Sequence, residues 1–341
     1  MARNATNETL KNARSGKNDE FYTVLSDIEK ELKHYRHHFE GKVVLCNCDD
    51  PRISNFFHYF SYNFDKLKLK RLITTCYQND DMDLFSTNQS ESAIWLEYFG
   101  EKSGNRVPSL TEIGVKQLEG DGDFRSLECV SLLEEADIIV TNPPFSLFRE
   151  YLAQLIQHNK KFLIVGTWNA ISYKETFELI RENKLWIGIN SNRNFSGFIV
   201  PDHYPMHGSE ARIDNEGRRI VSSNNTCWFT NMDNEKRHEK LILYRTFDPA
   251  TYLEYDNFNA IEVSRVNDIP KDYDGIMGVP ITFLDKYNPE QFEIVGSDYD
   301  VKVGKLPELV KAGWTGKLDR AYLDGKRIYA RLLIKLRKPA K

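Results

Sequence analysis

The tetrapeptide Asn142-Pro143-Pro144-Phe145 contains the residue types best suited to hold and modify a planar substrate that carries nitrogen. The side-chain oxygen of Asn142 and the carbonyl oxygen of Pro143 are two acceptors about one residue apart, held by a stiff turn. An exocyclic amine, which has two N–H groups, fits this pair. Phe145 adds a flat surface on which a base or an amide can stack. The alternative is a strand that ends at its prolines and has no chemistry.

The residues before the tetrapeptide predict the strand that positions it. Ile138-Ile139-Val140 is short and β-branched, which is typical of a strand buried on both faces of a parallel sheet. Two consecutive prolines cannot continue this strand, because each lacks a backbone donor and has φ fixed at about −65°. The chain must leave the sheet at Asn142, at the carboxyl end of the strand, where open α/β sheets bind their ligands.

Alternating strand and helix patterns predict an α/β fold with a doubly wound, mostly parallel sheet. Strands are expected at residues 43–46, 71–77, 95–98, 138–140, 162–165, 185–189, 198–200 and 225–231, and helices at residues 27–39, 53–64, 127–136, 148–158 and 174–183. Beyond about residue 235 the alternation is lost. We expect a flexible arm over residues 1–18, a core over residues 19–235 and a smaller C-terminal region over residues 236–341.

Composition limits the class of protein. The 341 residues are 40% hydrophobic and 28% charged, which is enough for a substantial core and argues against global disorder. No run approaches 18 consecutive apolar residues and the N-terminus is polar, so we expect neither a membrane span nor a secretory signal. The five cysteines are typical of reduced thiols in a cytoplasmic protein, and their spacing argues against a metal site.

The charge is unevenly distributed along the chain. A net charge of −4 argues against a protein that coats nucleic acid indiscriminately, yet residues 301–341 contain twelve Lys and Arg and only three Asp and Glu. Trp314, Tyr322 and Tyr329 are interleaved with these cations. Basic residues among aromatic ones suit phosphate contact combined with base stacking. A solvated surface or a frayed terminus is the alternative.

Four motifs, in this order, resemble those of the EcoRI-type adenine-specific modification methylases. They are Asp19-Glu20-Phe21-Tyr22-Thr23, Cys46-Asn47-Cys48-Asp49-Asp50-Pro51-Arg52, Gly120-Asp121-Gly122-Asp123-Phe124-Arg125-Ser126 and Val140-Thr141-Asn142-Pro143-Pro144-Phe145. The last of them also resembles the catalytic motif of N-methyltransferases that act on exocyclic or amide nitrogen. The resemblance covers the first 240 residues well and continues more weakly through residues 279–287. It implies a Rossmann-like methyltransferase core that uses S-adenosylmethionine, followed by a C-terminal target-recognition region.

The resemblance also implies roles for individual residues. The catalytic set would be Asn142, Pro143, Pro144 and Phe145. The cofactor set would be Phe21, Tyr22, Thr23, Asn47, Asp49, Asp50, Pro51, Asp123 and Phe124. Within it, Asp123 would bind the amino group of the cofactor's adenine and Phe124 would stack on the ring; turn chemistry is the alternative for Asp123. The turn at residues 50–55 lacks the glycines that relatives carry there, and the residue that binds the ribose is left open.

The implied activity is methyl transfer from S-adenosylmethionine to N6 of an adenine flipped out of double-stranded DNA. DNA contacts are expected at Arg193, Lys326, Arg327 and Arg331. The resemblance further implies a cytoplasmic, prokaryotic or phage-encoded enzyme that protects DNA in a restriction–modification system; an enzyme that acts alone is the alternative. Its cognate endonuclease would act on the same site without forming a stable complex. If specificity follows the EcoRI type, the site is GAATTC with the inner adenine modified.

Two other interpretations remain open. The Asn-Pro-Pro-aromatic motif is shared with methyltransferases that act on RNA or on a protein amide nitrogen. The missing glycines would also suit a DNA-binding module with a degenerate cofactor site. A nicotinamide-dependent enzyme is disfavoured, because the chain has no Gly-x-Gly-x-x-Gly turn.

Overall fold

The chain forms two compact units. The computed structural model describes residues 22–48, 54–76, 93–100, 115–191, 195–200, 211–222 and 225–338. Within these ranges, the first unit extends to Phe177 and includes Leu185–Asp233, and the second consists of Glu178–Lys184 together with the chain from Asn234 onward. Residues 178–184 were expected in the core region, whereas the structure packs them with the C-terminal unit. The arm expected at residues 1–18 lies outside the described residues.

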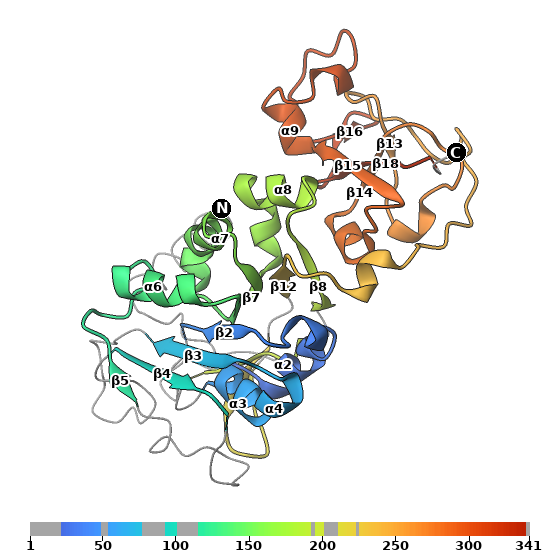
Figure 1. Ribbon diagram of the computed structural model, residues 1–341. Helices are drawn as coiled ribbons and strands as arrows, with labels where there is room; N and C mark the ends of the chain where they lie inside the picture. Colours follow the sequence, from blue (N-terminus) through green and yellow to red (C-terminus); the bar gives the residue numbers. More distant parts are fainter. Residues whose placement is uncertain are drawn as a thin grey trace. The chain divides into compact units, whose positions relative to one another are not determined.

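The first unit contains the strand–helix alternation (Figure 1). Its strands are β1 (Tyr22–Thr23), β2 (Val43–Cys46), β3 (Arg71–Cys76), β4 (Ile94–Tyr98), β5 (Lys116–Gln117), β6 (Ile138–Thr141), β7 (Lys161–Thr167), β8 (Trp186–Ser191), β9 (Phe198–Ile199), β10 (Ala211–Ile213), β11 (Arg219–Val221) and β12 (Thr226–Thr230). Its helices are α2 (Leu25–Leu32), α3 (Asn55–Tyr62), α4 (Phe64–Leu67), α6 (Leu127–Glu135) and α7 (Phe148–Gln157), with 3-10 helices η1 (Arg36–His38), η2 (Phe145–Leu147) and η3 (Trp168–Ser172). Helix α8 (Lys174–Arg181) continues from the first unit into the second.

A large mixed sheet forms the centre of the first unit, with the strand order β5-β4-β3-β2-β6-β7-β12-β8. Strands β3, β2, β6 and β7 are parallel neighbours. The flanking strands pair antiparallel, β4 and β5 at one edge and β12 and β8 at the other. Helices α6 and α7 lie on one side of the sheet, and α2 and α3 lie on the other (Figure 1). The α/β class is confirmed. In this sheet the parallel pairing is confined to the central strands, so the sheet is mixed and not mostly parallel as expected.

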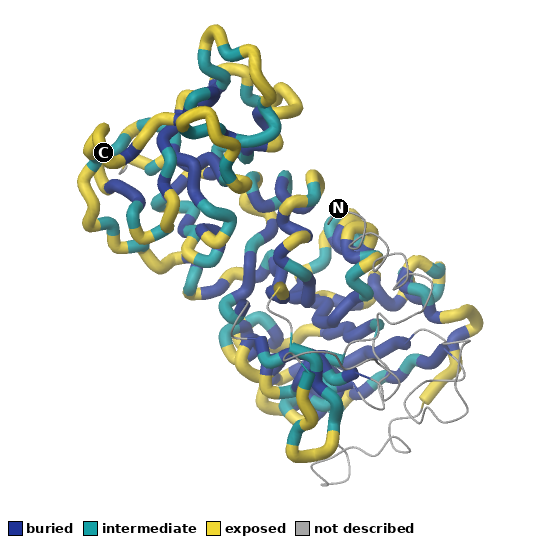
Figure 2. The backbone as a smooth tube through the Cα atoms, turned by 180° about the vertical axis from the view of Figure 1, so that it is seen from behind, coloured by how far each residue is buried: buried dark blue, intermediate teal, exposed yellow. Residues whose placement is uncertain are grey.

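The central strands are buried on both faces, as their β-branched sequences predict. Every residue of β2 and β6 is buried, and Figure 2 shows stretches of buried backbone in the interior, with the exposed backbone mainly at the outer loops. Aromatic residues of α3 pack against this sheet, and Phe56 and Phe60 are fully buried. Burial of a side chain of this size contributes roughly 1.5–3 kcal/mol, so the sheet and its helices provide a rigid support for the loops at the strand ends.

Helix α2 is shorter than expected, because it ends at Leu32 and not at residue 39. Two of its carboxylates are buried and bind backbone N–H groups of a distant segment. Glu31 accepts hydrogen bonds from the N–H groups of Ile189 at 2.8 Å and Asn190 at 2.7 Å. Asp27 accepts bonds from the backbone N of Ser196 at 2.6 Å and from its hydroxyl at 2.7 Å. These bonds hold the end of β8 and the approach to β9 against α2.

A second, antiparallel sheet of the first unit has the order β1-β9-β11-β10. In the β1–β9 pair, Tyr22 is opposite Ile199 and Thr23 is opposite Phe198. The pairing joins the start of the described chain to a segment about 175 residues later in the sequence, a separation that local patterns do not reveal.

The second unit has its own sheet, with the order β13-β14-β18-β15, and a separate hairpin of β16 and β17. Its strands are β13 (Ile261–Glu262), β14 (Met277–Val279), β15 (Phe292–Ser297), β16 (Tyr322–Leu323), β17 (Lys326–Arg327) and β18 (Leu332–Leu336). Its short helices are η5 (Glu235–His238), η6 (Val266–Asp268), η7 (Ile281–Lys286), α9 (Asp298–Lys302) and η8 (Pro307–Leu309). Tyr255, Phe258 and Leu333 are buried at the centre of its core. Among the helices described here, none is both long and apolar enough to cross a membrane.

Candidate active site

The tetrapeptide begins where β6 ends. The ladder between β6 and β7 stops at Thr141, which is opposite Ile164, so Asn142 is the first residue beyond the sheet. Its side chain is buried, with a relative exposure of 7% for the residue. The chain then turns at the prolines, the Leu147 N–H donates to the Pro144 carbonyl at 3.0 Å, and η2 leads directly into α7. The strand exit predicted from the proline pair is confirmed.

A chain of hydrogen bonds joins the end of β6 to the end of β2. The hydroxyl of Thr141 donates to the backbone carbonyl of Asn47, which is the first residue after β2. The side-chain oxygen of Asn47 accepts a hydrogen bond from the hydroxyl of Tyr151 in α7. Burial raises the pKa of the Tyr151 hydroxyl well above its usual range, so this group remains a protonated donor. Asn47 is therefore fixed beside the tetrapeptide by both its backbone and its side chain.

The glycine-punctuated loop at residues 119–126 lies at the same edge of the sheet. The ring of Phe124 is buried and meets the ring of Tyr151 edge-on, with centroids 5.0 Å apart and planes at 77°. The side-chain amide of Gln154 donates to the Phe124 carbonyl at 3.0 Å. Tyr151 thus contacts both Asn47 and Phe124, two residues that the sequence analysis placed in one cofactor site.

Gly122 brings this loop against the end of β3. Its φ is +78°, and a Cβ at this position would lie 2.3 Å from the carbonyl oxygen of Cys76. Only a residue without a side chain permits that approach. The loop expected to bind the cofactor's adenine is therefore seated on the carboxyl end of the strand next to β2.

The carboxylate of Asp123 is held by its neighbour Arg125. The guanidinium donates to both carboxylate oxygens, at 2.9 Å and 2.6 Å, and it also pairs with Glu150 at 2.9 Å. Side-chain hydrogen bonds from Arg125 lower the pKa of Asp123, so the carboxylate remains an ionised acceptor. Asp123 also takes part in an Asx turn, because its backbone N donates to Asp121 at 2.9 Å. The turn chemistry considered as the alternative is present, and it leaves the carboxylate charged and able to accept a bond from an amine.

The β1 strand meets the tetrapeptide through Phe198. The ring of Phe198 lies 5.8 Å from that of Phe145, edge-on at 71°, and Phe198 is the partner of Thr23 across the β1–β9 pair. The side-chain amide of Asn55 in α3 donates to the Thr23 carbonyl at 2.8 Å and fixes β1 from the other side. Among the described residues, the hydroxyl of Thr23 is buried and has no hydrogen-bond partner. Such a hydroxyl suits a site for a polar ligand, since a buried polar group without a partner is costly.

The structure brings together one part of the predicted site and leaves another part outside the described residues. Tyr22, Thr23, Asn47, Asp123 and Phe124 are all on elements that reach the strand ends around Asn142. Phe21, Asp49, Asp50, Pro51 and Arg193 lie outside the described ranges.

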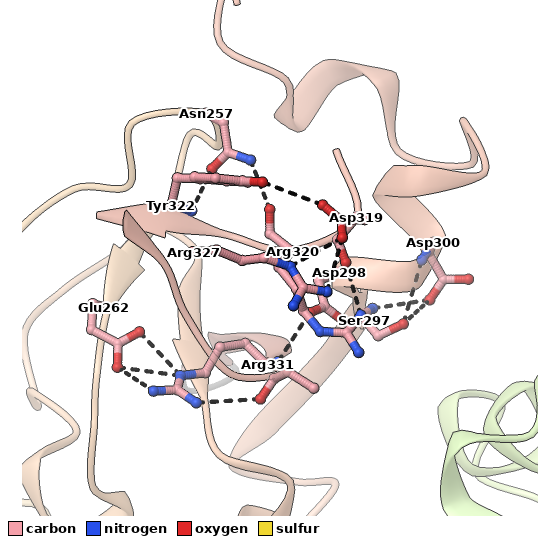
Figure 3. Close-up of polar contacts among 11 residues, drawn as sticks. Asn257, Glu262, Ser297, Asp298, Asp300, Asp319, Arg320, Tyr322, Arg327 and Arg331 are labelled. Carbon is pink, nitrogen blue, oxygen red and sulfur yellow. Dashed lines mark hydrogen bonds and ion pairs between the residues drawn. The ribbon is translucent and has the colours of Figure 1, made fainter. Parts of the chain in front are cut away.

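The three expected DNA contacts of the second unit differ in their surroundings. Lys326 and Arg327 form β17 and are exposed, and Arg327 pairs with Asp319 at 2.8 Å. Arg331 instead forms an ion pair with Glu262 at 2.6 Å, and the two side chains are only 11% and 9% exposed (Figure 3). Its charge is compensated inside the unit, so this geometry favours a structural role for Arg331 and not a phosphate contact.

The residues that connect the motifs in the structure were not predicted from the sequence. Tyr151 was part of an expected helix, and Phe198 was part of an expected short strand, but no pattern linked either residue to the site. Asp27 and Glu31 lie in a helix expected from the sequence, but nothing in the sequence indicated that both are buried. Each of these buried carboxylates accepts hydrogen bonds from backbone N–H groups of a distant segment. The sequence alone could not show this, because it does not identify those partners.

Comparison with known proteins gives a consistent result. The profile of a family described as "Adenine-specific methyltransferase EcoRI" matches residues 9–337. The Type II methyltransferase M.EcoRI of Escherichia coli is 54% identical over 297 residues, which cover 86% of this chain and 90% of that protein. The Type II methyltransferase M.MgeORF184P of Mycoplasma genitalium is 36% identical over 332 residues, which cover 95% and 97%. The Type II methyltransferase M.MpnI of Mycoplasma pneumoniae is 35% identical over 287 residues, which cover 83% of each. No solved structure matches the chain.

Proposed function

The chain belongs to the adenine-specific EcoRI methyltransferase family, and from this premise we propose how its residues carry out the reaction. It is an adenine-specific DNA methyltransferase of the Type II, restriction–modification kind. The methyl donor is S-adenosylmethionine, and the acceptor is N6 of an adenine in double-stranded DNA. The observation that carries this assignment is the convergence of Asn142 with Asn47 and Phe124, through Thr141 and Tyr151, at the carboxyl ends of parallel strands.

Three groups of residues fit the cofactor. Tyr22 and the buried hydroxyl of Thr23 would hold its methionine part. Asn47, at the end of β2, would also contact it. The ionised carboxylate of Asp123 accepts a bond from the amino group of the cofactor's adenine, and Phe124 provides apolar surface for the ring. When bound, the cofactor supplies an electrophilic methyl group on its sulfonium.

The acceptor adenine must leave the duplex, because a base inside the helix cannot reach a site at a sheet edge. Flipping it out costs a few kcal/mol. The side-chain oxygen of Asn142 and the Pro143 carbonyl then accept hydrogen bonds from the two N6–H groups. These bonds turn the nitrogen lone pair out of conjugation with the ring and direct it at the methyl carbon.

No strong base is needed for this step. The new N6–C bond forms as the S–C bond breaks, and N6 becomes acidic only after the methyl group has arrived. The proton can then leave to solvent. Phe145 stacks on the flipped base, and its edge contact with Phe198 fixes the plane on which the base rests. Orientation by preorganised acceptors carries most of the rate, and such groups are worth roughly 10²–10³-fold each.

The remaining parts of the proposal concern architecture and partners. The first unit is a doubly wound, Rossmann-like methyltransferase core, supported by parallel central strands with helices on both sides. The second unit, from Asn234 onward, is the target-recognition region. A cognate endonuclease acts on the same site without a stable complex, and GAATTC with the inner adenine modified is the proposed target.

Transfer of labelled methyl from S-adenosylmethionine tests the reaction. We expect label on duplex DNA and none on RNA or on a peptide-chain release factor, the alternative substrates of this motif. Label on either alternative substrate in place of DNA would contradict the proposal. Modification-sensitive long-read sequencing of DNA from expressing cells then identifies the modified base and the target. A calorimetric titration that shows no binding of S-adenosylmethionine, with DNA binding intact, would instead favour a DNA-binding module.

A further inference from the structure

The second unit is nearly neutral, although its last segment is strongly basic. Residues 234–341 contain 19 Lys and Arg and 17 Asp and Glu. Many cations of the basic segment are already paired within the unit: Lys305 with Glu178, Lys311 with Glu254, Arg327 with Asp319, Arg331 with Glu262 and Lys338 with Asp274. A diffuse attraction between a basic tail and DNA phosphates therefore does not describe this unit. If it binds DNA, a discrete element must make the contact.

The β16–β17 hairpin has the exposure expected of such an element. Tyr322 is opposite Arg327 and Leu323 is opposite Lys326. The turn consists of Asp324 and Gly325, both with positive φ, +52° and +72°. Two consecutive positive φ values are the conformation of the tight hairpin turn whose twist matches that of the strands. Both residues of β17 are exposed.

Two side chains of this segment are available for contact. Within the described residues, Lys326 forms no ion pair, unlike its neighbour Arg327. Tyr329, two residues after the hairpin, is 86% exposed. A cation and a largely exposed aromatic residue, three residues apart, combine a donor for base edges or phosphates with a surface for apolar contact.

The hairpin is fixed at both ends by one buried carboxylate. Asp298, whose side chain is 5% exposed, lies 3.4 Å from the guanidinium Nε of Arg320, just before β16. Its oxygen also accepts a hydrogen bond at 3.4 Å from the backbone N of Arg331, after β17 (Figure 3). The entry and the exit of residues 320–331 thus converge on a single side chain.

A neighbouring loop binds β16 and the turn. The Tyr322 N–H donates to the side-chain oxygen of Asn257 at 2.9 Å, and the Asn257 amide donates to the Arg320 carbonyl at 2.8 Å. The Gly325 N–H donates to the carboxylate of Asp256 at 2.7 Å. Asn257 is fully buried. These bonds make the hairpin an extension of the folded unit and not a free loop.

The Arg331–Glu262 pair adds a third anchor. The hydroxyl of Tyr255 donates to the same carboxylate at 2.5 Å, and Gly278 leaves room for it, because a Cβ there would lie 1.9 Å from the Tyr255 oxygen. Buried ion pairs contribute little net stability relative to apolar residues of similar volume. A pair that holds the start of β18 beside an exposed hairpin is better explained as a positioning device.

We propose that the β16–β17 hairpin, together with the adjoining Tyr329, is the element of the second unit that enters a groove of the target DNA. Lys326 and Tyr329 make the contacts, and Arg331 and Glu262 are positioning residues. This inference rests on the proposed function. A two-stranded ribbon fits the major groove, which is about 12 Å wide. A ribbon that is held in place before binding loses little conformational entropy on contact, so more of its contact energy appears as affinity.

The first experiment separates base reading from phosphate contact. The variants are Lys326→Ala, Tyr329→Ala and the double variant, with Lys335→Ala, another exposed lysine of the same unit, as the matched control. Affinity is measured for a duplex that contains the target and for one that lacks it. We expect the affinity of the double variant to fall about tenfold or more for the target duplex and less than about threefold for the other, so discrimination should fall about threefold or more, roughly 0.7 kcal/mol. The affinity of the Lys335→Ala control should fall less than about twofold for both duplexes.

An equal loss of affinity for both duplexes would mean that the hairpin contacts only phosphates, and it would overturn the groove assignment. Unchanged affinity for both duplexes would overturn it as well. The wild-type protein supplies the reference for the proposed function. If it methylates duplex DNA and the hairpin variants bind like wild type, only this inference fails. If it transfers no methyl to DNA, the proposed function fails first. Binding of S-adenosylmethionine by each variant verifies that the first unit is intact.

The second experiment tests the positioning role with Arg331→Met combined with Glu262→Gln. This double variant removes the ion pair without leaving a buried charge, so the thermal unfolding temperature should change by only a few degrees. Discrimination between the two duplexes should nevertheless fall about as far as in the hairpin double variant. Arg320→Gln, at a side chain that is 32% exposed, removes the cation that pairs with Asp298 at the entry to the hairpin and should also lower discrimination. Unchanged discrimination in both variants would refute the positioning role.

Discussion

The ring of Phe145 meets the ring of Phe198 edge-on, with centroids 5.8 Å apart and planes at 71°. Phe198 is also the strand partner of Thr23. The residue proposed to stack on the flipped adenine and the strand proposed to line the cofactor site therefore share one neighbour. The carboxylate of Asp27 holds the segment just before Phe198 by its bonds to Ser196. The proposed positions of the base and of the cofactor thus both depend on one packed contact.

Phe198→Ala should affect both ligands. The substitution opens a cavity between Phe145 and β1, and such a loss in a core costs about 3–5 kcal/mol of stability. At a temperature where the variant remains folded, we expect about tenfold weaker binding of S-adenosylmethionine and a lower kcat. Phe198→Leu keeps most of the side-chain volume and should keep most of the cofactor affinity and most of kcat. Calorimetry and single-turnover methylation measure the two effects, and an effect on neither would show that the contact does not position the site.

Asn142→Ala should abolish turnover. The alanine removes one of the two acceptors for the N6–H groups, and loss of one preorganised group of this kind lowers kcat by roughly 10²–10³-fold. DNA affinity should stay within a few fold, because phosphate and groove contacts are elsewhere. Asn142→Asp is the matched control, since it keeps an acceptor oxygen in the same place and should retain more activity than the alanine. Retained activity in Asn142→Ala would refute the assigned role.

Gly122→Ala should weaken cofactor binding. Its Cβ would lie 2.3 Å from the Cys76 carbonyl, so the loop that carries Asp123 and Phe124 must shift away from β3. Gly217→Ala is a matched control, because Gly217 has nearly the same φ, +79°, and has nothing within 4 Å of the added carbon. Both variants are strained by roughly 1 kcal/mol in the left-handed region. Only Gly122→Ala should also reduce affinity for S-adenosylmethionine, and equal affinities in a calorimetric titration would remove the loop from the cofactor site.

The sequence predicted the elements of the first unit better than their connections. Short β-branched runs such as Val43–Cys46 and Ile138–Thr141 are buried strands as expected, because burial on both faces leaves a direct apolar signature. The exit at Asn142 followed from proline chemistry alone. The β1–β9 pairing could not be predicted, since two-residue strands far apart in sequence carry no periodicity.

The distribution of charge along the sequence did not predict which cations are paired in the fold, for a related reason. The excess of Lys and Arg in residues 301–341 is real, but several of these residues pair with carboxylates from elsewhere in the unit, as Arg331 does with Glu262. A linear count cannot show which cations are compensated in the fold. The sequence signal thus identified Lys326 and Arg331 equally, whereas their exposures separate them.

Asp298 should make the stability of the second unit depend on pH. Burial raises its pKa to about 6, despite the nearby Arg320. Because this value is above that of an unfolded aspartate, the folded unit binds the proton more tightly. The stabilising contribution of this group is present at low pH and is lost as pH rises through about 6. A shift from 3.8 to about 6 corresponds to a change on the order of 3 kcal/mol at most.

Urea denaturation of wild type and Asp298→Asn between about pH 5 and 7.5 measures this effect. Asparagine resembles the protonated acid and does not titrate, so the variant should gain in stability relative to wild type as pH rises. The difference between the two proteins cancels contributions from groups that both share, such as His38 and His58, whose pKa values are lowered by burial. A difference that is independent of pH would show that Asp298 does not titrate in this range. Since the carboxylate also holds Arg320 and the backbone of Arg331, the same variant should gain stability near pH 7.5 and lose discrimination between DNA sequences.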